Sequence, residues 1–496
     1  MTAANIDSVV NLCVRRGLIF PSSDLHGSIA GFFDYGPYGV ALKKRVQDAW
    51  WRWFVEQRQD VVGLDAAILS GEGVWKASGH LDAFNDPLVA CKKCKKRFRA
   101  DHLIKDELGL DVEGVSDEQL GALLKKHKLA CPDCKSELAE AKKFNLMFES
   151  RAGSVEEETA SRVFLRPETA QAIFTDFKQI QAVSRKKLPF GIAQVGKAFR
   201  NEISPRNFVF RSREFSMMEL EFFTKPQDDS APLEKKHLAL KITVLTAEEQ
   251  AKKGSKASEK TISDLLKDKT IASKWIAYWL AESVLFLNSL GLKNNLRLRQ
   301  HVKTELSHYS SDTWDVEYDY PEWGWKELLG VADRGDFDLT QHAKHSGKDL
   351  TYFDEEAKQK IMPHVVEPSF GLDRLVFTLL VDAYSENKGE KGSSVVLKLD
   401  EAVAPIRVAV FPLMKKDGLA EKAREVFEMM RAAGIGVEYD EAGSIGKRYA
   451  RMDEVGCPYC ITVDYDSLEK SDVTVRFRDS GKQERVKTDE LRKLFK

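Results

Sequence analysis

The chain has 496 residues, of which 43% are hydrophobic and 31% are charged, and its formal net charge is −1. This length predicts about three domains in a globular protein. The near-zero charge excludes a bulk polycation, so contacts with nucleic acid would need local basic patches. Because the N-terminus lacks a basic flank followed by a long apolar core, we expect no signal peptide and a cytoplasmic location.

The first predicted elements lie before residue 60. Apolar residues recur on one stripe of a short amphipathic helix at 5–16. A segment rich in glycine and aromatic residues then leads into a helix at about 39–58, which carries Trp50, Trp51 and Trp53. This aromatic stripe is typical of a core helix, whereas the Gly-Pro turn before it could also form a subunit interface. The residues alone leave both interpretations open.

A pair of C-x-x-C motifs follows, with 36 residues between them. Four thiolates suit a tetrahedral Zn²⁺ ion, but the gap exceeds the usual ~15–20 residues, so a small subdomain, helical over 101–128, must fill it. Reduced thiols without metal are the alternative. The basic residues at 92–99 are either a solvated edge or a contact for an RNA backbone. The candidate metal ligands are Cys91, Cys94, Cys131 and Cys134.

The most informative segment is 190–223, where two β-type runs flank a loop with four arginines. In the second run, alternation places Glu219 and Glu221 on one face. Burial of unpaired charge is costly, so the segment favours a ligand with both a phosphate and an ammonium group. The stretch from Gly191 to Ala198 nearly matches a phosphate-binding loop. Because Ala198 lacks the hydroxyl that would hold Mg²⁺, and a strand follows instead of a helix, we reject that motif.

Three charged residues outside this hairpin have a structural or a ligand-binding interpretation. Glu168 opens a predicted helix at about 169–183, and it could cap the helix or face a ligand. Glu327 is either a surface charge or a carboxylate for a metal ion. Arg374 lies in the first turn of a helix, where the dipole favours anions, so an arginine there suggests a polyanionic ligand. We attribute the Arg-Gly-Asp sequence at 334–336 to chance.

The rest of the chain divides by composition. The segment 225–273 is rich in lysine and serine, and within it AKKGSKASEK is predicted to be an exposed loop or a mobile insert. The apolar run at 275–290 contains Glu282, which favours a buried helix over a membrane span. After a linker at about 388–404, residues 405–496 alternate strands and helices as a compact α/β unit. Its C-x-x-C pair has no second pair beside it, so we expect Cys457 and Cys460 to pack rather than to bind metal.

Several of these segments together resemble one family. DYGPYGVALK resembles motif 1 of the homodimeric class II glycyl-tRNA synthetases, FRNEISPRNFVFRSREFSMMELEFF resembles motif 2, and EPSFGLDR resembles motif 3. LRPETAQ and GWKELLGVADR resemble further signatures of that family. The motifs occur in the family's order, and the resemblance extends from about residue 5 to the C-terminus, so it is specific.

The resemblance implies an α+β fold, in which an antiparallel catalytic sheet is flanked by helices, carries an inserted cysteine module and is followed by an α/β anticodon-binding domain. It also implies a homodimer formed through motif 1, with Pro37 near the interface. The implied units are the N-terminal part of the catalytic domain (1–90), the cysteine module (91–147), the catalytic core (148–390) and the anticodon-binding domain (405–496).

The implied activity is the ATP-dependent attachment of glycine to tRNA(Gly) through a glycyl-adenylate, with Mg²⁺ on the ATP and Zn²⁺ as a structural option in the cysteine module. The implied catalytic residues are Arg200, Arg374 and Glu327. The implied ATP-binding residues are Arg200, Asn201, Glu202, Phe210, Arg211, Arg213, Phe215, Glu327, Leu328, Gly371 and Arg374. The implied glycine-binding residues are Arg99, Glu168, Phe215, Glu219, Glu367 and Ser369.

Two rival interpretations remain. A class II synthetase for proline, threonine or histidine should have a larger and more apolar pocket than this acidic set of residues. A non-catalytic relative that only binds nucleic acid should have lost motif residues that are present here. Motif 3 differs from the family pattern at one position, because Asp373 stands where some relatives carry glycine. The sequence leaves the effect of this difference on ATP affinity open.

Overall fold

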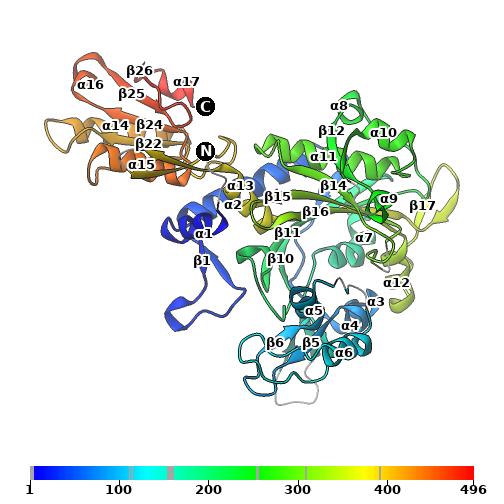
Figure 1. Ribbon diagram of the computed structural model, residues 1–496. Helices are drawn as coiled ribbons and strands as arrows, with labels where there is room; N and C mark the ends of the chain where they lie inside the picture. The colour runs from blue at the N-terminus through cyan, green and yellow to red at the C-terminus, as the bar shows by residue number, and fades with distance from the viewer. Residues whose placement is uncertain are drawn as a thin grey trace.

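The computed structural model describes residues 5–110, 112, 115–153, 161–252, 256–307, 310–389 and 392–495. Within these residues, the central element is a nine-stranded sheet with the order β13-β12-β14-β15-β16-β19-β11-β10-β3 (Figure 1). Neighbouring strands are antiparallel except in the pairs β12–β14 and β10–β3. This confirms the predicted antiparallel sheet. The strands are β3 (Val61–Gly63), β10 (Phe190–Phe199), β11 (Glu214–Thr224), β12 (Lys241–Leu245), β13 (Ser258–Thr261), β14 (Leu296–Gln300), β15 (Asp312–Tyr320), β16 (Gly324–Gly335) and β19 (His364–Gly371).

Different helices cover the two faces of this sheet. Phe222 of β11 packs on Trp279, with ring centroids 5.0 Å apart, whereas the next residue, Phe223, packs on Phe177 at 4.5 Å. Successive side chains of a strand point to opposite faces, so the two phenylalanines belong to two separate cores. The first core includes α2 (Pro37–Trp51), α11 (Lys274–Ser289) and α13 (Leu372–Ala383), and the second includes α7 (Ala170–Ser184) and α12 (Phe337–Ser346).

The N-terminal elements pack beside the first core. Helix α1 (Ile6–Arg15) is followed by the short strands β1 (Ile19–Pro21) and β2 (Phe33–Tyr35), and the chain between them projects from the body of the molecule (Figure 1). Helix α2 continues as a π-helical turn at Arg52–Glu56. The aromatic stripe of α2 is a core stripe, because Trp50 and Phe54 are fully buried.

The cysteine module contains a small three-stranded sheet with the order β6-β5-β7 and two helices. Helices α5 (Ala100–Leu108) and α6 (Asp117–Lys126) confirm the predicted helical filling between the two C-x-x-C motifs. Figure 1 shows this module at one edge of the central domain. Its strands are β5 (Asn85–Ala90), β6 (Arg97–Arg99) and β7 (Lys142–Asn145).

Smaller elements connect the module to the main sheet. Helices α3 (Glu72–Ala77) and α4 (His80–Ala83) precede β5, and a second three-stranded sheet has the order β4-β9-β8. A hairpin of β17 and β18 follows α12. These strands are β4 (Leu69–Gly71), β8 (Phe148–Ala152), β9 (Ser161–Leu165), β17 (Tyr352–Asp354) and β18 (Gln359–Ile361).

The C-terminal unit is an α/β domain with its own hydrophobic core, as predicted. Its five-stranded sheet has the order β23-β22-β24-β25-β26, with β22 parallel to both β23 and β24. It lies at the far end of the molecule from the cysteine module (Figure 1). Its elements are β22 (Val408–Pro412), α14 (Leu419–Ala432), β23 (Val437–Tyr439), α15 (Ile445–Val455), β24 (Tyr459–Val463), α16 (Tyr465–Lys470), β25 (Asp472–Phe477), β26 (Gln483–Lys487) and α17 (Leu491–Leu494).

The segment 225–273 is folded, which corrects part of the sequence prediction. Its strands β12 and β13 form one edge of the main sheet, and residues Ser258 to Lys260, predicted as loop, lie in β13. Residues 253–255 of the predicted loop lie outside the described residues. Part of its apolar surface is buried: Ile242, Val244, Ile262 and Leu265 all belong to the main core. Its helices are α8 (Lys235–Leu238), α9 (Ala247–Ala251) and α10 (Ile262–Lys267).

The predicted linker at 388–404 is also more structured than expected. Its first part pairs with the preceding residues as a hairpin of β20 (Tyr384–Gly389) and β21 (Gly392–Leu397). Leu397, Leu399 and Val403 are buried in the main core, so this connection packs against the central domain. No helix in the described part of the chain combines the length and the hydropathy that a membrane span requires.

Candidate active site

The loop between β10 and β11 opens onto a cavity of about 180 Å³, which we call the arginine cavity. β10 and β11 are paired from Phe190–Phe223 to Phe199–Glu214, so the loop begins and ends at one end of the hairpin. β10 includes the stretch that resembled a phosphate-binding loop, which confirms that it is a strand. The residues that line the cavity are Arg200, Glu202, Val209, Phe210, Arg211, Ser212, Phe215, Ser216, Met217, Glu327, Ser369, Gly371, Asp373 and Arg374.

Three guanidinium groups, of Arg200, Arg211 and Arg374, line this cavity together with the carboxylates of Glu202, Glu327 and Asp373. Arg374 forms an ion pair with Glu327 at 3.1 Å, and Arg211 forms one with Glu202 at 3.4 Å. The charge of Arg374 holds the pKa of Glu327 below its usual range. Arg200 has no carboxylate partner of this kind in the described residues, and its guanidinium lies over the Phe215 ring at 5.4 Å. Because Asp373 is paired with Lys43, which does not line the cavity, the charge of Arg200 is not balanced by a lining carboxylate and suits an anionic ligand.

Three of the predicted ATP-binding residues do not line the cavity. Arg213 donates hydrogen bonds to the carbonyl oxygens of Glu202 (3.0 Å) and Ala30 (2.7 Å), and therefore fixes the loop. The backbone N–H of Asn201 donates to the backbone carbonyl of Leu146. Leu328 is buried in the main core. The other eight predicted residues do line it.

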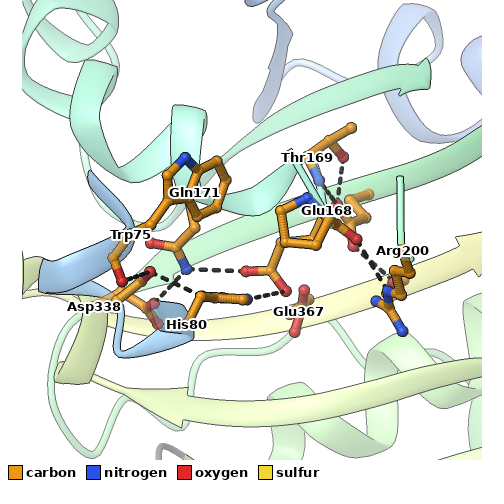
Figure 2. Close-up of polar contacts among 12 residues, drawn as sticks. Trp75, His80, Glu168, Thr169, Gln171, Arg200, Asp338 and Glu367 are labelled. Carbon is orange, nitrogen blue, oxygen red and sulfur yellow. Dashed lines mark hydrogen bonds and ion pairs between the residues drawn. The ribbon is translucent and has the colours of Figure 1, made fainter. Parts of the chain in front are cut away.

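Behind the cavity lies a buried group of carboxylates, which we call the acidic cluster: Glu168, Glu219, Glu221, Asp338 and Glu367. Ser369 donates a hydrogen bond to Glu219 at 3.0 Å, and the backbone amide of Thr169 donates to its other oxygen at 2.6 Å. Gln171 bridges Glu168 (3.0 Å) and Asp338 (2.9 Å) through its amide nitrogen, as Figure 2 shows. The carboxylates of the cluster therefore come from β11, β19, α12 and the residues just before α7.

One buried guanidinium lies within this cluster. Arg334 is 1% exposed and binds Asp338 at 2.8 Å and Glu367 at 2.9 Å. The ring nitrogen Nε2 of His80 lies 3.5 Å from a carboxylate oxygen of Glu168, and Figure 2 shows the two side chains together. Five carboxylates therefore lie around one arginine and one histidine, and the cluster offers carboxylate oxygens to a further cation such as an ammonium group.

The carboxylates of the acidic cluster differ in the direction in which their pKa values are shifted. Burial alone would raise the pKa of Glu168, but His80 and Arg334 hold that pKa well below its usual range. Burial and the charge of Glu168 raise the pKa of Glu219. Burial raises the pKa of Glu367 to about 7, against the effect of Arg334 and with the help of Glu219 and Glu168. Burial and Glu367 also raise the pKa of Glu221, whose oxygens have no hydrogen-bond partner among the described residues.

Sequence reasoning missed the central cation of this cluster. Arg334 belongs to the Arg-Gly-Asp sequence that we attributed to chance, and its role in the structure has no connection with that tripeptide. Arg334 lies four residues before Asp338, and β16 ends and α12 begins between them. This short spacing was the sequence signal that could have indicated an ion pair between the two residues. Thr169, Gln171 and His80 were missed as well, although Thr169 and Gln171 lie beside Glu168 in the segment LRPETAQ.

Arg99, predicted to bind glycine, is not part of the acidic cluster in this structure. It lies at the start of α5 in the cysteine module and forms ion pairs with Asp86 at 2.8 Å and Asp101 at 2.5 Å. All three residues line a second cavity of about 290 Å³. In the described residues, the ion pairs of Arg99 are with these two aspartates and not with Glu219.

The four predicted metal ligands converge. The Sγ atoms of Cys91, Cys94, Cys131 and Cys134 all lie within 4.8 Å of one another. Four sulfur donors in one compact group are the usual set for a structural Zn²⁺ ion, so the residues fit that metal. By contrast, Cys457 and Cys460 are buried among apolar residues of the C-terminal domain, which confirms the prediction that they pack.

Comparisons with known proteins agree on one family. The chain is 46% identical to the glycine–tRNA ligase of Caldanaerobacter subterraneus subsp. tengcongensis, over 99% of this chain and 97% of that protein. It is 47% identical to the glycine–tRNA ligase of Clostridium tetani over the same shares. It is 45% identical to the glycine–tRNA ligase of Bacillus thuringiensis subsp. konkukian, over 98% of each chain.

Two further comparisons concern the fold and the last domain. Residues 407–496 match a family model described as an anticodon binding domain. Among solved structures, the prolyl-tRNA synthetase of Cryptosporidium parvum, complexed with L-proline and AMP, has a TM-score of 0.58 at 14% identity. That alignment covers 98% of this chain and 76% of the other. At this identity the likeness shows the fold alone, which is that of a class II synthetase.

Proposed function

The chain belongs to the glycine–tRNA ligase family of class II aminoacyl-tRNA synthetases and uses ATP to attach glycine to tRNA(Gly), and we propose that glycine and ATP are held where the arginine cavity meets the acidic cluster. The observation that supports this placement is the position of Ser369. Its side chain lines the arginine cavity and donates a hydrogen bond to Glu219 of the acidic cluster. A site for a polyanion and a site for a cation therefore share one wall.

In this proposal the arginine cavity binds ATP. Arg200 holds the α-phosphate, and Arg211 and Arg374 hold the outer phosphates, because a planar guanidinium suits bidentate binding of phosphate oxygens. The adenine ring lies on Phe215, and Glu202 accepts a hydrogen bond from its edge. Phe210, which supports the Arg374 guanidinium at 4.8 Å, and Gly371 complete the wall. Asn201, Arg213 and Leu328 act indirectly, by fixing the loop and the strand below it.

Glu327 is the residue that fits a Mg²⁺ ion on the phosphates. Its side chain is half-exposed at the cavity, and Arg374 keeps it ionised. Mg²⁺ prefers carboxylate and phosphate oxygens, and it would neutralise part of the phosphate charge when bound. Arg211 and Arg374 would stabilise the remaining charge of the leaving pyrophosphate.

The acidic cluster would bind the glycine ammonium group through Glu168, Glu219, Glu367 and Ser369. The glycine carboxylate then points toward Arg200, attacks the α-phosphorus and displaces pyrophosphate to form glycyl-adenylate. In the second step a ribose hydroxyl of tRNA(Gly) attacks the acyl carbonyl, and AMP leaves. Protein groups act by positioning and by charge stabilisation rather than by covalent chemistry.

Selection of glycine would depend on exclusion. Glycine has no side chain to bind, so the pocket must penalise an added methyl group by clash and by desolvation of the buried carboxylates. The hydrogen bonds from Thr169 and Ser369 fix Glu219 in place, which keeps the pocket small. Arg99, from the cysteine module, would close over the bound glycine.

Further features complete the proposal. We propose a cytoplasmic homodimer that associates through motif 1 near Pro37. The exposed Leu25 and Ile29, on the projection between β1 and β2, offer it apolar surface. We assign 1–90 and 148–390 to the catalytic domain, 91–147 to a zinc-binding module and 405–496 to an anticodon-binding domain for tRNA(Gly).

ATP–pyrophosphate exchange tests the proposed substrates directly. Exchange should depend on glycine and should be absent with alanine, serine, proline or threonine at the same concentration. Exchange with a larger amino acid would contradict the exclusion mechanism, and no exchange with any amino acid would favour a non-catalytic relative. Transfer of labelled glycine to tRNA(Gly) tests the second step separately.

Substitution of Glu219 tests the amine pocket. Glu219→Gln should raise the KM for glycine by about tenfold or more, because it removes a buried charge that faces the ammonium group, and should leave the KM for ATP nearly unchanged. The matched control is Glu214→Gln on the same strand, where Glu214 forms a more exposed pair with Lys197. An unchanged KM for glycine in Glu219→Gln would remove Glu219 from the pocket.

A further inference from the structure

One carboxylate at the wall of the arginine cavity accepts hydrogen bonds from three separate segments. Asp373 Oδ1 accepts from the Tyr35 hydroxyl at 2.6 Å and from Lys43 Nζ at 2.5 Å. Its Oδ2 accepts from the backbone amide of Ser216 at 2.5 Å. Tyr35 lies in β2, Lys43 in α2 and Ser216 in β11, so Asp373 ties the first turn of α13 to motif 1 and motif 2 at once.

Lys43 completes this arrangement from the other side. Its ammonium group also donates to Ser216 Oγ at 2.8 Å and lies over the Tyr35 ring at 4.3 Å. The Lys43 and Asp373 side chains are only 14% and 7% exposed. A buried ion pair seldom adds stability over an apolar pair of similar size, so stability alone does not account for charged groups here.

The position of the pair suggests what the charges do. Asp373 and Ser216 both line the arginine cavity, and each is adjacent in sequence to a proposed ATP ligand: Arg374 and Phe215. Gly371, at the N-cap of α13, offers no side-chain cap. The hydrogen bonds of Asp373 therefore connect the start of α13 to β11. Arg374, the proposed ligand of the triphosphate, lies on α13, and Phe215, the proposed partner of the adenine ring, lies on β11.

We propose that Lys43 and Asp373 are positioning residues for adenylate formation, which hold β11 and α13 at the spacing at which Phe215 and Arg374 bind the same ATP molecule. This inference rests on the proposed ATP site. Lys43 acts through Asp373 and Ser216 and is not itself a lining residue of the cavity. The inference also gives Asp373 a role that glycine at this position could not perform, because glycine has no carboxylate to accept these bonds.

The test measures ATP–pyrophosphate exchange for Lys43→Met, Asp373→Asn and the double variant. Each single variant should raise the KM for ATP by about tenfold or more, the range expected for loss of a hydrogen bond to a charged group, with the KM for glycine unchanged. The double variant should be no worse than Asp373→Asn alone, because the two residues act as one unit. Lys44→Met on the same helix is the control, since Lys44 is exposed and pairs with Asp48 on the surface.

Milder variants keep the test valid if Lys43→Met folds poorly. Tyr35→Phe removes one hydrogen bond to Asp373 and Ser216→Ala removes one from Lys43, and both should raise the KM for ATP by a smaller factor. Lower thermal stability with normal KM values for ATP in all of these variants would overturn the proposal, as would an equal rise in the KM for glycine. Arg374→Ala distinguishes failure of the positioning role from failure of the proposed ATP site. If Arg374→Ala also leaves the KM for ATP unchanged, the ATP site itself is misplaced.

Discussion

Glu367 is the carboxylate of the acidic cluster whose charge changes in the neutral pH range. Burial raises its pKa to about 7, while Arg334 opposes this effect and Glu219 and Glu168 reinforce it. Below that pH Glu367 is mostly protonated and attracts an ammonium group weakly. The affinity for glycine should therefore increase with pH, by up to about tenfold between about pH 6 and about pH 8.

Two measurements check this pH dependence. The KM for glycine in pyrophosphate exchange should fall as the pH rises, and Glu367→Gln should remove that slope. Because the pKa of Glu367 is raised, its contribution to stability is present at low pH and is lost as the pH rises through about 7. Glycine should offset this loss, so it should raise Tm more at about pH 8 than at about pH 6. If the KM for glycine still falls with rising pH in Glu367→Gln, the pH dependence belongs to Glu219 or Glu221, whose pKa values are also raised.

The four arginines of the 200–213 loop have different surroundings, and this predicts different effects of substitution. Arg200 faces the cavity without a carboxylate partner of its own in the described residues, whereas Arg206 is exposed and lies 3.9 Å from Asp106. Arg200→Ala should lower kcat for adenylate formation by about 100-fold or more, the usual cost of removing a group that stabilises transition-state charge. Arg206→Ala should stay within about twofold of the wild type. Near-normal exchange in Arg200→Ala would contradict its assignment to the α-phosphate.

Strand alternation made part of the acidic cluster predictable from sequence. Glu219 and Glu221 were placed on one face of β11 by their spacing alone. Spacing could have linked Arg334 to Asp338, but not to Glu367 and Glu168, which lie in other segments of the chain. The same limit applied to Asp373, whose partners Tyr35 and Lys43 lie more than 300 residues earlier.

Elements with one clearly apolar face were predicted well from the sequence. The strands β12 and β13, at the edge of the main sheet, were not. Helices α7, α11 and α13 have long apolar stripes, which the sequence shows directly. In contrast, β12, β13 and α10 bury only a few apolar residues and direct their lysines to solvent, so composition alone suggested a loop. Local signals were present: Thr246 with Glu249, and Thr261 with Asp264, form capping boxes at the starts of α9 and α10.

The cysteine module is the element whose folding should depend on metal. Its core is small, and its four cysteines connect the chain before β6 to the chain after α6. Cys131→Ser should lose the bound Zn²⁺ and weaken amide-exchange protection across α5 and α6, because a structural site contributes directly to folding. Cys460→Ser, which alters a buried cysteine of the C-terminal domain, is the control and should keep the metal. A purified wild type without metal would instead support the reduced-thiol alternative.

At the scale of the whole molecule, the division into a central sheet, an inserted module and a C-terminal domain could be predicted because each unit has its own composition and periodicity. The contacts between units could not, since they join side chains that lie far apart in the sequence. The C-terminal domain is attached to the motif 1 region through such contacts. Tyr38 of α2 donates to Glu438 at 2.7 Å, and Arg15 of α1 pairs with Glu454 at 3.1 Å.

These contacts predict a separation between the two reaction steps. Glycine activation needs only the catalytic domain, whereas charging needs the catalytic and anticodon-binding domains to hold one tRNA together. Glu454 also pairs with Arg16, so Tyr38→Phe combined with Glu454→Gln weakens three polar contacts between the domains. The double variant should therefore raise the KM for tRNA(Gly) by about two- to tenfold, the range expected when a few partly exposed hydrogen bonds are weakened. Pyrophosphate exchange should remain close to the wild-type rate.

The control for this experiment is Lys422→Ala on α14, which breaks a surface pair with Glu425 inside the C-terminal domain without affecting its attachment. It should leave both steps unchanged. An equal loss of exchange and charging in the Tyr38 and Glu454 variant would contradict the prediction, because it would mean that the contacts support the catalytic domain itself. Unchanged charging would mean that other contacts, such as the packing of Leu397 and Leu399 on the main core, hold the two domains together.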